Sequence, residues 1–152
     1  MGKKSRDLFT TMPSARGRNE KGEIHKCLAL QWELHRAAAE INFREGTKLK
    51  HMMAIVIGKE INRIEGIQAW DTADRKEEVL SFTFPSAQSD IHTSFFMPKE
   101  LYTDLKKVSH YTGISAREII ANGLALYLLN EYGEKYPDLV QPIKNQKYLE
   151  SK

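Results

Sequence analysis

The sequence predicts a mainly helical fold that also contains short strands, and three observations support this prediction. Apolar residues recur at helical spacing over most of residues 23–67. A second helical pattern runs from residue 99 to about residue 132 and is broken by Gly113, a residue type that ends helices. Two β-prone runs, residues 79–84 and 91–97, are each followed closely by proline, which is excluded from the interior of a paired sheet.

The composition is that of one globular domain, or of two very small ones that share a core. The chain has 152 residues, 41% of them hydrophobic, and a formal net charge of +3. Because this charge is only mildly basic, contact with nucleic acid requires basic side chains placed together. The sequence has one cysteine, no apolar leader and no apolar run of membrane-spanning length. We therefore expect a cytoplasmic protein without a disulfide and without a membrane partner.

Residues 1–22 are expected to form a basic arm that contains a short strand at residues 7–12. Residues 1–26 carry seven basic and three acidic side chains, an excess of positive charge larger than that of the whole chain. One interpretation of the arm is a solvated terminus. The other is an arm that follows DNA phosphates, for which local positive charge is the physical requirement. In that case the contacting residues are Lys3, Lys4 and Arg6.

The region from residue 23 to residue 70 is expected to form a helical hairpin. The first helix is predicted over residues 23–43, where a run of three alanines favours the helix. Gly46 ends this helix, and Thr47 then caps a second helix over residues 48–67. Two apolar faces of the second helix are nearly continuous, so we expect it to be well buried.

Residues 71–90 are expected to be a linker that includes the first β-prone run. The unit that follows, residues 91–133, contains the second β-prone run and an amphipathic helix ended by a glycine. Ser115 begins the next helix with a capping box, in which a glutamate stands three residues later. Residues 134–152 contain two prolines and are expected to be a docked or frayed tail.

The segment from His92 to Leu129 resembles the ribbon-helix-helix (Arc/MetJ-like) family of DNA-binding proteins. The family pattern is a short strand ending in an apolar residue and proline, a first helix, a Gly-x-Ser/Thr turn and a longer second helix. Here those parts are Thr-Ser-Phe-Phe-Met-Pro, the helix from Lys99, the turn Gly-Ile-Ser at residues 113–115, and the helix that follows. The resemblance implies a mainly α fold with a short two-stranded antiparallel ribbon.

In such proteins the ribbon enters the major groove of double-stranded DNA, and its outward side chains contact base edges. The resemblance implies that His92, Ser94 and Phe96 point outward from the strand. It also implies that the start of the second helix faces phosphates, because backbone N–H groups point away from that end. The residues at this position are Ser115, Ala116 and Arg117.

The strand departs from the family in one respect. Family strands usually present arginine, lysine, glutamine or asparagine outward, whereas this one presents histidine, serine and phenylalanine, which offer fewer hydrogen bonds to bases. Three alternatives stay open. The protein recognises DNA shape, the basic arm supplies the contacts, or the unit binds protein instead of DNA.

The first half of the chain resembles a degenerate copy of this unit. Apolar positions in residues 52–61 match those of residues 119–128 at an offset of 67, whereas Phe9–Pro13 matches residues 94–98 at an offset of 85. Two such units in one chain would form a pseudo-dimer. That arrangement resembles an accessory protein of T-DNA transfer systems, which binds an enhancer beside the transfer border. The DNA contacts of the first copy would then be Thr11, Thr47, Lys48 and Lys50.

The alternative to a pseudo-dimer is a homodimer that forms through the C-terminal unit and carries a separate helical N-terminal domain. In this alternative, residues 79–84 pair with residues 91–97 as a hairpin, although the loop between the two runs is longer than is usual for hairpins. The ribbon would then depend on two chains, and the mass of the protein in solution would distinguish the two arrangements.

We expect no enzymatic activity, no cofactor and no metal site. The sequence has no phosphate-binding glycine loop and no nucleophile-elbow motif, and the group His25, Cys27 and His35 has no further ligands downstream. Cys27 is instead expected to be a small core residue. The expected function is binding of double-stranded DNA, as a transcriptional repressor or as an accessory factor in plasmid or conjugative DNA transfer, alone or with a protein partner. The alternatives are a protein-interaction module and the antitoxin of a toxin–antitoxin pair.

Overall fold

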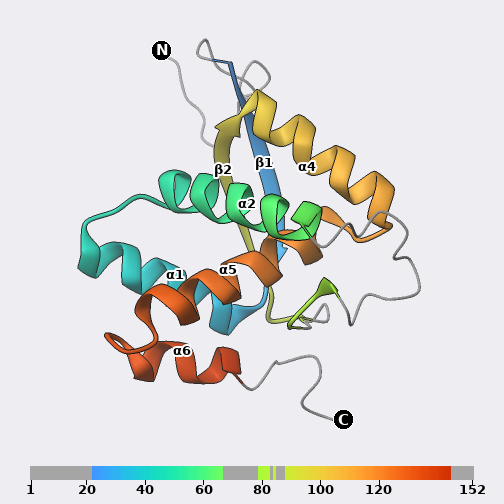
Figure 1. Ribbon diagram of the computed structural model, residues 1–152. Helices are drawn as coiled ribbons and strands as arrows, with labels where there is room; N and C mark the ends of the chain where they lie inside the picture. Colours follow the sequence, from blue (N-terminus) through green and yellow to red (C-terminus); the bar gives the residue numbers. More distant parts are fainter. Residues whose placement is uncertain (1–21, 67–78, 83, 85–87, 145–152) are drawn as a thin grey trace, which may run out of the picture.

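The protein is mainly helical and contains one two-stranded antiparallel sheet within its described residues (Figure 1). The computed structural model describes residues 22–66, 79–82, 84 and 88–144. The elements in chain order are β1 (Glu23–Leu30), α1 (Trp32–Glu45), α2 (Leu49–Gly66), β2 (Ile91–Pro98), α4 (Lys99–Thr112), α5 (Ala116–Tyr132) and α6 (Pro137–Lys144). A strand followed by two helices therefore occurs twice, first from β1 to α2 and then from β2 to α5.

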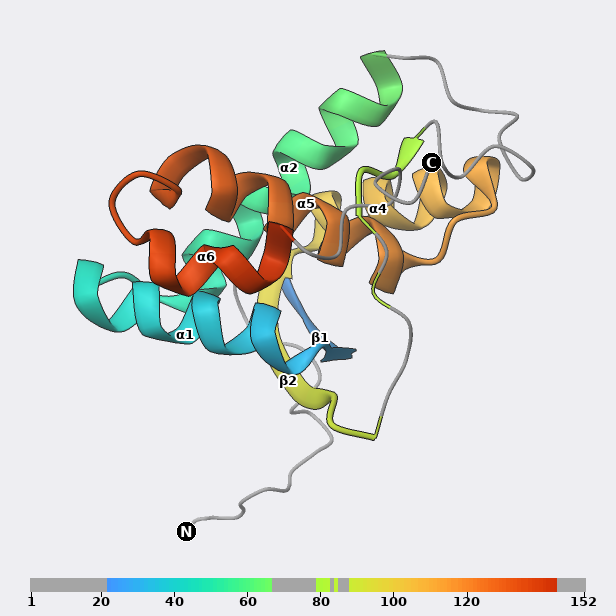
Figure 2. The ribbon, with the colours of Figure 1, turned by 90° about the horizontal axis from the view of Figure 1, so that it is seen from below.

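The two strands pair with each other and form a ribbon within the chain. Their Cα partners run from Glu23 opposite Pro98 to Leu30 opposite Ile91. Successive side chains of a strand point to opposite faces, so Leu30 and Met97 are buried under the helices while alternate positions are more exposed. The ribbon consequently lies at one edge of the helical body, with one face packed and the other outward (Figure 2).

The two strand-helix-helix segments are intertwined and share one core. α2 packs against β2 and α4 of the second segment, and α5 packs against β1 and α1 of the first. α2 and α5 also contact each other, and they approach closely at Gly123, where a Cβ atom would lie 2.9 Å from the Cβ of Glu60. Each segment therefore completes the burial of the apolar residues of the other.

The prediction of one helix over residues 23–43 is wrong at its start. Residues Glu23–Leu30 form β1, and the helix begins at Trp32. The stretch contains alternating apolar positions at Ile24, Leu28 and Leu30, a spacing that suits a strand with one packed face. Pairing with β2, far along the chain, decides between the two states. The strand predicted at residues 7–12 lies outside the described residues, but the match of Phe9–Pro13 to residues 94–98 is wrong, because β1 is the strand that precedes α1 and pairs with β2.

The hairpin between residues 79–84 and 91–97 is also wrong. β2 pairs with β1, and residues 79–84 contribute no strand to the sheet in the part of the chain that the structure describes. Phe82 and Phe84 are nevertheless buried, so this β-prone run serves as a core-filling segment. Its apolar residues belong to the same hydrophobic core as the buried residues of the helices.

The predicted turns at the ends of the first helices are confirmed. Gly46 ends α1 with φ 71°, and Gly113 ends α4 with φ 73°, so each turn needs the left-handed backbone that glycine adopts readily. The capping box of α5 is confirmed as well. Thr47 does not follow its expected role, because α2 begins at Leu49 and the Thr47 hydroxyl donates to Oδ1 of Asn42 at 2.6 Å.

The last described element packs onto the body of the protein. α6 contacts α1 and α5 and buries Leu139, Val140 and Ile143. Within the described residues, every helix is too short or too polar to cross a membrane.

Candidate nucleic-acid interface

Six side chains point away from the helices on the outward side of the ribbon, and we call this surface the ribbon face. Three alternate positions of β1 and three of β2 make it up. In cross-strand order the pairs are His25 with Phe96, Cys27 with Ser94, and Ala29 with His92. The cysteine, the serine and the second histidine are exposed, and the other three side chains are half-buried.

The ribbon face offers a mixture of polar and aromatic groups. The rings of His25 and Phe96 lie 5.1 Å apart between centroids and are tilted by 43°. Sγ of Cys27 lies 3.8 Å from Nδ1 of His25. Two imidazoles and one hydroxyl can donate or accept hydrogen bonds, and the phenyl ring and the methyl group of Ala29 can contact apolar atoms. The surface can thus contact base edges, including the thymine methyl group.

Half of the ribbon face follows from the resemblance and half was missed. His92, Ser94 and Phe96 lie together on the outward side, as the resemblance implies. The partners from β1 were missed because residues 23–30 were expected to be helical. The expectation that Cys27 lies in the core is wrong, since its side chain is exposed. The offset of 67 would have identified the missing strand, because it places His25 on His92.

The start of α5 is closed by its own cap. The hydroxyl of Ser115 accepts a hydrogen bond from the backbone N–H of Glu118 at 3.1 Å, and the carboxylate of Glu118 accepts from the backbone N–H of Ser115 at 3.2 Å. Ser115 is exposed and Ala116 is half-buried. A phosphate at this helix start would therefore lie beside the carboxylate of Glu118, which already accepts a hydrogen bond from a backbone N–H group there.

Arg117 is held inside the protein by three hydrogen bonds. Its Nε donates to the carbonyl oxygen of Ala29 at 2.7 Å, and its Nη1 donates to that of Phe84 at 2.7 Å. Its Nη2 donates to Oδ2 of Asp90 at 3.0 Å, and 21% of the side chain is exposed. The guanidinium thus links α5 to the end of β1 and to the segment that leads into β2. This position differs from the outward phosphate contact that the resemblance implies.

The start of α2 carries more positive charge than the start of α5. Lys48 is exposed, and Nζ of Lys50 lies 2.9 Å from Oε1 of Glu23, with 43% of the lysine side chain exposed. Thr47, which precedes them, is exposed as well. The first turn of α2 has no acidic residue. The remaining predicted contacts, Lys3, Lys4, Arg6 and Thr11, lie outside the described residues.

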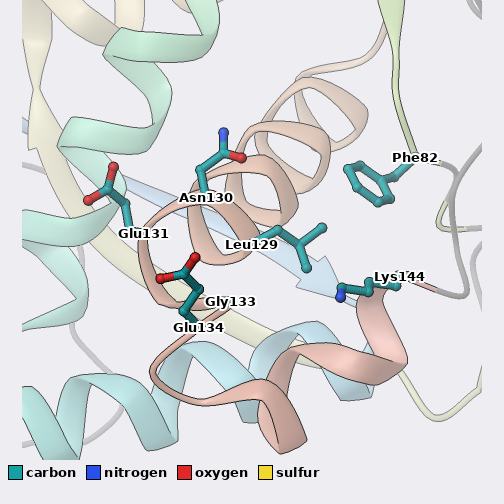
Figure 3. Close-up of a pocket in the computed structure, with 7 residues that line it drawn as sticks. All are labelled: Phe82, Leu129, Asn130, Glu131, Gly133, Glu134 and Lys144. Atoms are coloured by element: carbon teal, nitrogen blue, oxygen red, sulfur yellow. The ribbon is translucent and has the colours of Figure 1, made fainter.

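A pocket of about 570 Å³ lies at the C-terminal end of α5 (Figure 3). Phe82 and the last turn of α5 line it, together with Lys144 at the end of α6. Glu131 and Glu134 contribute carboxylates, and Lys144 contributes an amine from the other side. None of the described residues that line the pocket carries a hydroxyl or a thiol.

Metal ligands do not gather in the part of the chain that the structure describes. No group of three or more histidine, cysteine, aspartate or glutamate side chains there could hold a metal ion. His25 and Cys27 are neighbours on one strand, but His35 lies on α1.

Comparisons with known proteins do not identify a family. No family model, no curated protein and no solved structure matches the chain.

Proposed function

We propose that the protein binds double-stranded DNA through the ribbon face, as a single-chain pseudo-dimer of two ribbon-helix-helix units. The observation that carries the proposal is the outward two-stranded ribbon, which is formed within one chain and is followed on both strands by two helices. A two-stranded antiparallel ribbon has a width that the major groove of B-form DNA admits. Its outward side chains would then contact the base edges.

Two further features support DNA binding. Each second helix starts near an end of the ribbon, since Lys50 of α2 contacts Glu23 of β1 and Arg117 of α5 contacts Ala29. Backbone N–H groups at the start of α2, whose first turn has no acidic residue, can hold a phosphate beside the groove. The exposed Lys48, and the basic residues Lys3, Lys4 and Arg6, would add salt-dependent contacts. The cellular role we propose is transcriptional repression or an accessory step in plasmid or conjugative DNA transfer, in the cytoplasm.

The proposal is tested by binding of the whole chain to a fluorescent duplex of random sequence at increasing salt. We expect binding that weakens steeply between about 50 mM and about 200 mM salt, because neutralised phosphates release counterions. In a plot of the logarithm of the binding constant against the logarithm of the salt concentration, Lys48→Ala should make the slope less steep by about one unit. Lys144→Ala, a lysine change beside the pocket of Figure 3, is the matched control and should leave the slope unchanged. Absence of duplex binding at low salt would overturn the proposal.

The single cysteine provides a direct test of the surface that touches DNA. Cys27 stands in the middle pair of the ribbon face, so duplex DNA in the groove should cover it. We expect saturating duplex to slow alkylation of Cys27 by a maleimide, and prior alkylation to block binding. The variant Cys27→Ser should bind DNA with or without maleimide treatment. Alkylation at an unchanged rate in the DNA complex would assign binding to another surface.

A second candidate function is protein binding, which the outer face of α1 favours. Phe43 is 82% exposed and Trp32 is 44% exposed. They lie three helical turns apart and thus on one face, which also carries Arg36 and Ala39. Two results together would favour this function. The chain would bind no duplex, and it would bind a protein partner that the variant Phe43→His no longer binds.

A further inference from the structure

The two ends of the ribbon face carry different side chains. At one end, which we call the aromatic end, His25 stands opposite Phe96 and their rings are in contact. At the other end, which we call the alanine end, His92 stands opposite Ala29. One end therefore presents an imidazole and a phenyl ring, and the other presents an imidazole and a methyl group.

The internal repeat shows which of these differences break the symmetry. The offset of 67 residues that relates α1 to α4 and α2 to α5 places His25 on His92 and Cys27 on Ser94. The middle pair thus maps onto itself, and its two side chains differ by sulfur in place of oxygen. The same offset places Ala29 on Phe96, which is the large difference on the ribbon face.

The charged side chains beside the two ends of the ribbon face differ as well. α2 starts beside the aromatic end, because Lys50 bonds Glu23 at that end of β1. Among the described residues at this helix start, Lys48 and Lys50 accompany one acidic side chain, Glu23. α5 starts beside the alanine end, because Arg117 bonds the carbonyl of Ala29; there one arginine stands with two acidic side chains, Asp90 and Glu118. Attraction for phosphates is therefore stronger beside the aromatic end.

Symmetric dimers place the same surface on both halves of a site, and they therefore select palindromic DNA. We infer that this chain, if it binds DNA through the ribbon face as proposed, recognises a non-palindromic duplex in one orientation. The aromatic end holds the half-site that presents a thymine methyl group to Phe96, since aromatic side chains contact that methyl group in the major groove. The alanine end contacts its half-site more weakly.

The inference is tested by selecting duplexes from a pool with a randomised centre on the immobilised full chain and sequencing them. We expect one non-palindromic motif with thymine in one half. Each half of the motif is then doubled to give two palindromic duplexes, and the chain should prefer the original duplex to the duplex that doubles the alanine-end half by roughly tenfold. A palindromic motif would overturn this inference and leave DNA binding intact. Failure to retain any duplex would overturn the proposed function itself.

Two substitutions restore symmetry from opposite directions. Phe96→Ala gives both ends an alanine, and Ala29→Phe gives both ends a phenylalanine opposite a histidine. Phe96→Ala should lose the preference for thymine, and its affinities for the original duplex and for both doubled duplexes should become equal within about twofold. Ala29→Phe should bind the doubled aromatic-end duplex as tightly as the original or tighter. Circular dichroism establishes that each variant folds, and one folded variant is sufficient. A folded Phe96→Ala that still prefers the original duplex would overturn the inference. A folded Ala29→Phe that binds the original duplex more tightly than the doubled aromatic-end duplex would overturn it as well.

Discussion

The second helices α2 and α5 occupy equivalent places in the two strand-helix-helix segments, yet one faces solvent where the other is buried. Ile55 of α2 and Asn122 of α5 stand at the same position of the repeat, and Ile55 is 46% exposed whereas Asn122 is fully buried. An apolar side chain thus lies outside and a polar one inside, the reverse of the usual preference. The segment at residues 79–82 explains the difference, because it contacts Asn122.

The buried side chain of Asn122 holds the segment at residues 79–82, which lies between the two strand-helix-helix segments. Oδ1 of Asn122 accepts hydrogen bonds from the backbone N–H groups of Ser81 at 2.7 Å and Phe82 at 2.9 Å. Its Nδ2 donates to Oε2 of Glu60 at 2.6 Å. Arg63 pairs with the same buried carboxylate through two nitrogens and also donates to the carbonyl of Val79. Repeated backbone therefore does not imply repeated surroundings, and the linker makes α5 the more specialised helix.

The largest expected effect is that of Asn122→Ala. The change leaves two backbone N–H groups without their acceptor and weakens the hydrogen bonding of the buried Glu60, so the free energy of unfolding should fall by about 3 kcal/mol. The matched control is Ile55→Ala at the equivalent position of α2, which should lower it by less than about 1 kcal/mol because the side chain is half exposed. Urea unfolding followed by circular dichroism measures both. Equal losses for the two variants would mean that the network contributes nothing beyond helix packing.

The second largest effect is expected at the ion pairs that lie at the starts of α2 and α5, because removing one pair should destabilise the protein more than removing the other. Arg117 with Asp90, and Lys50 with Glu23, are equivalent pairs in the repeat. Arg117→Ala also removes two hydrogen bonds to backbone carbonyls, so we expect a loss of about 2 kcal/mol in the free energy of unfolding. Lys50→Ala should cost about 0.5 kcal/mol, because the lysine is partly exposed. Urea titrations measure this comparison as well, and a larger loss for the lysine variant would contradict it.

The second segment could be predicted from local chemistry, whereas half of the first could not. Gly113 and the Ser115 cap mark the turn between α4 and α5, and Pro98 marks the end of β2, so the order of elements is visible in the sequence. Gln31 stands where the repeat would place Pro98, so no proline separates β1 from α1. Leucine, alanine and lysine in β1 tolerate a helix, and the strand depends on pairing with a partner that no local pattern reveals.

The same reason explains which site residues were missed. The outward residues of β2 follow from alternation along a strand that was expected, and those of β1 needed the strand itself. Arg117 was expected at the surface because its position in the helix suggests a phosphate contact. Its acceptors belong to residues 29, 84 and 90, which only the tertiary fold brings together.

A smaller difference between the segments depends on pH. Glu45 ends α1, and its carboxylate accepts hydrogen bonds at 2.7 Å from Lys135 and from the hydroxyl of Tyr136; these contacts lower the pKa of Glu45 below its ordinary value of 4.5. Thr112, the equivalent residue of α4, bonds the carbonyl of Val108 and does not titrate. Because the folded pKa is lowered, the stabilisation is complete above pH 4.5 and is lost as the pH falls through the lowered value.

Glu45→Gln should therefore unfold at lower urea concentration than the original protein near neutral pH, and the gap should close in acid. Urea midpoints measured on both proteins from neutral pH to below the ordinary glutamate pKa give the comparison. Glu40→Gln, a change to a carboxylate of the same helix that pairs with Arg44, is the control for general charge effects. A gap that persists in acid would show that the amide disturbs the contact for a reason other than charge.

The smallest expected effect concerns the outer faces of α1 and α4. Phe43 lies at the end of α1 and is 82% exposed, and the repeat places it on His110 of α4, which is also exposed. Phe43→His gives both helices a histidine at this position, and it should change the free energy of unfolding by no more than about 0.5 kcal/mol, because little apolar surface is removed from contact. The measurement is a urea titration at two protein concentrations.

A loss above about 1 kcal/mol that grows with protein concentration would mean that Phe43 is covered by another copy of the chain in solution, since association stabilises the folded state by mass action. The difference between the two faces would then contribute to assembly, and α1 would be the more specialised of the two first helices.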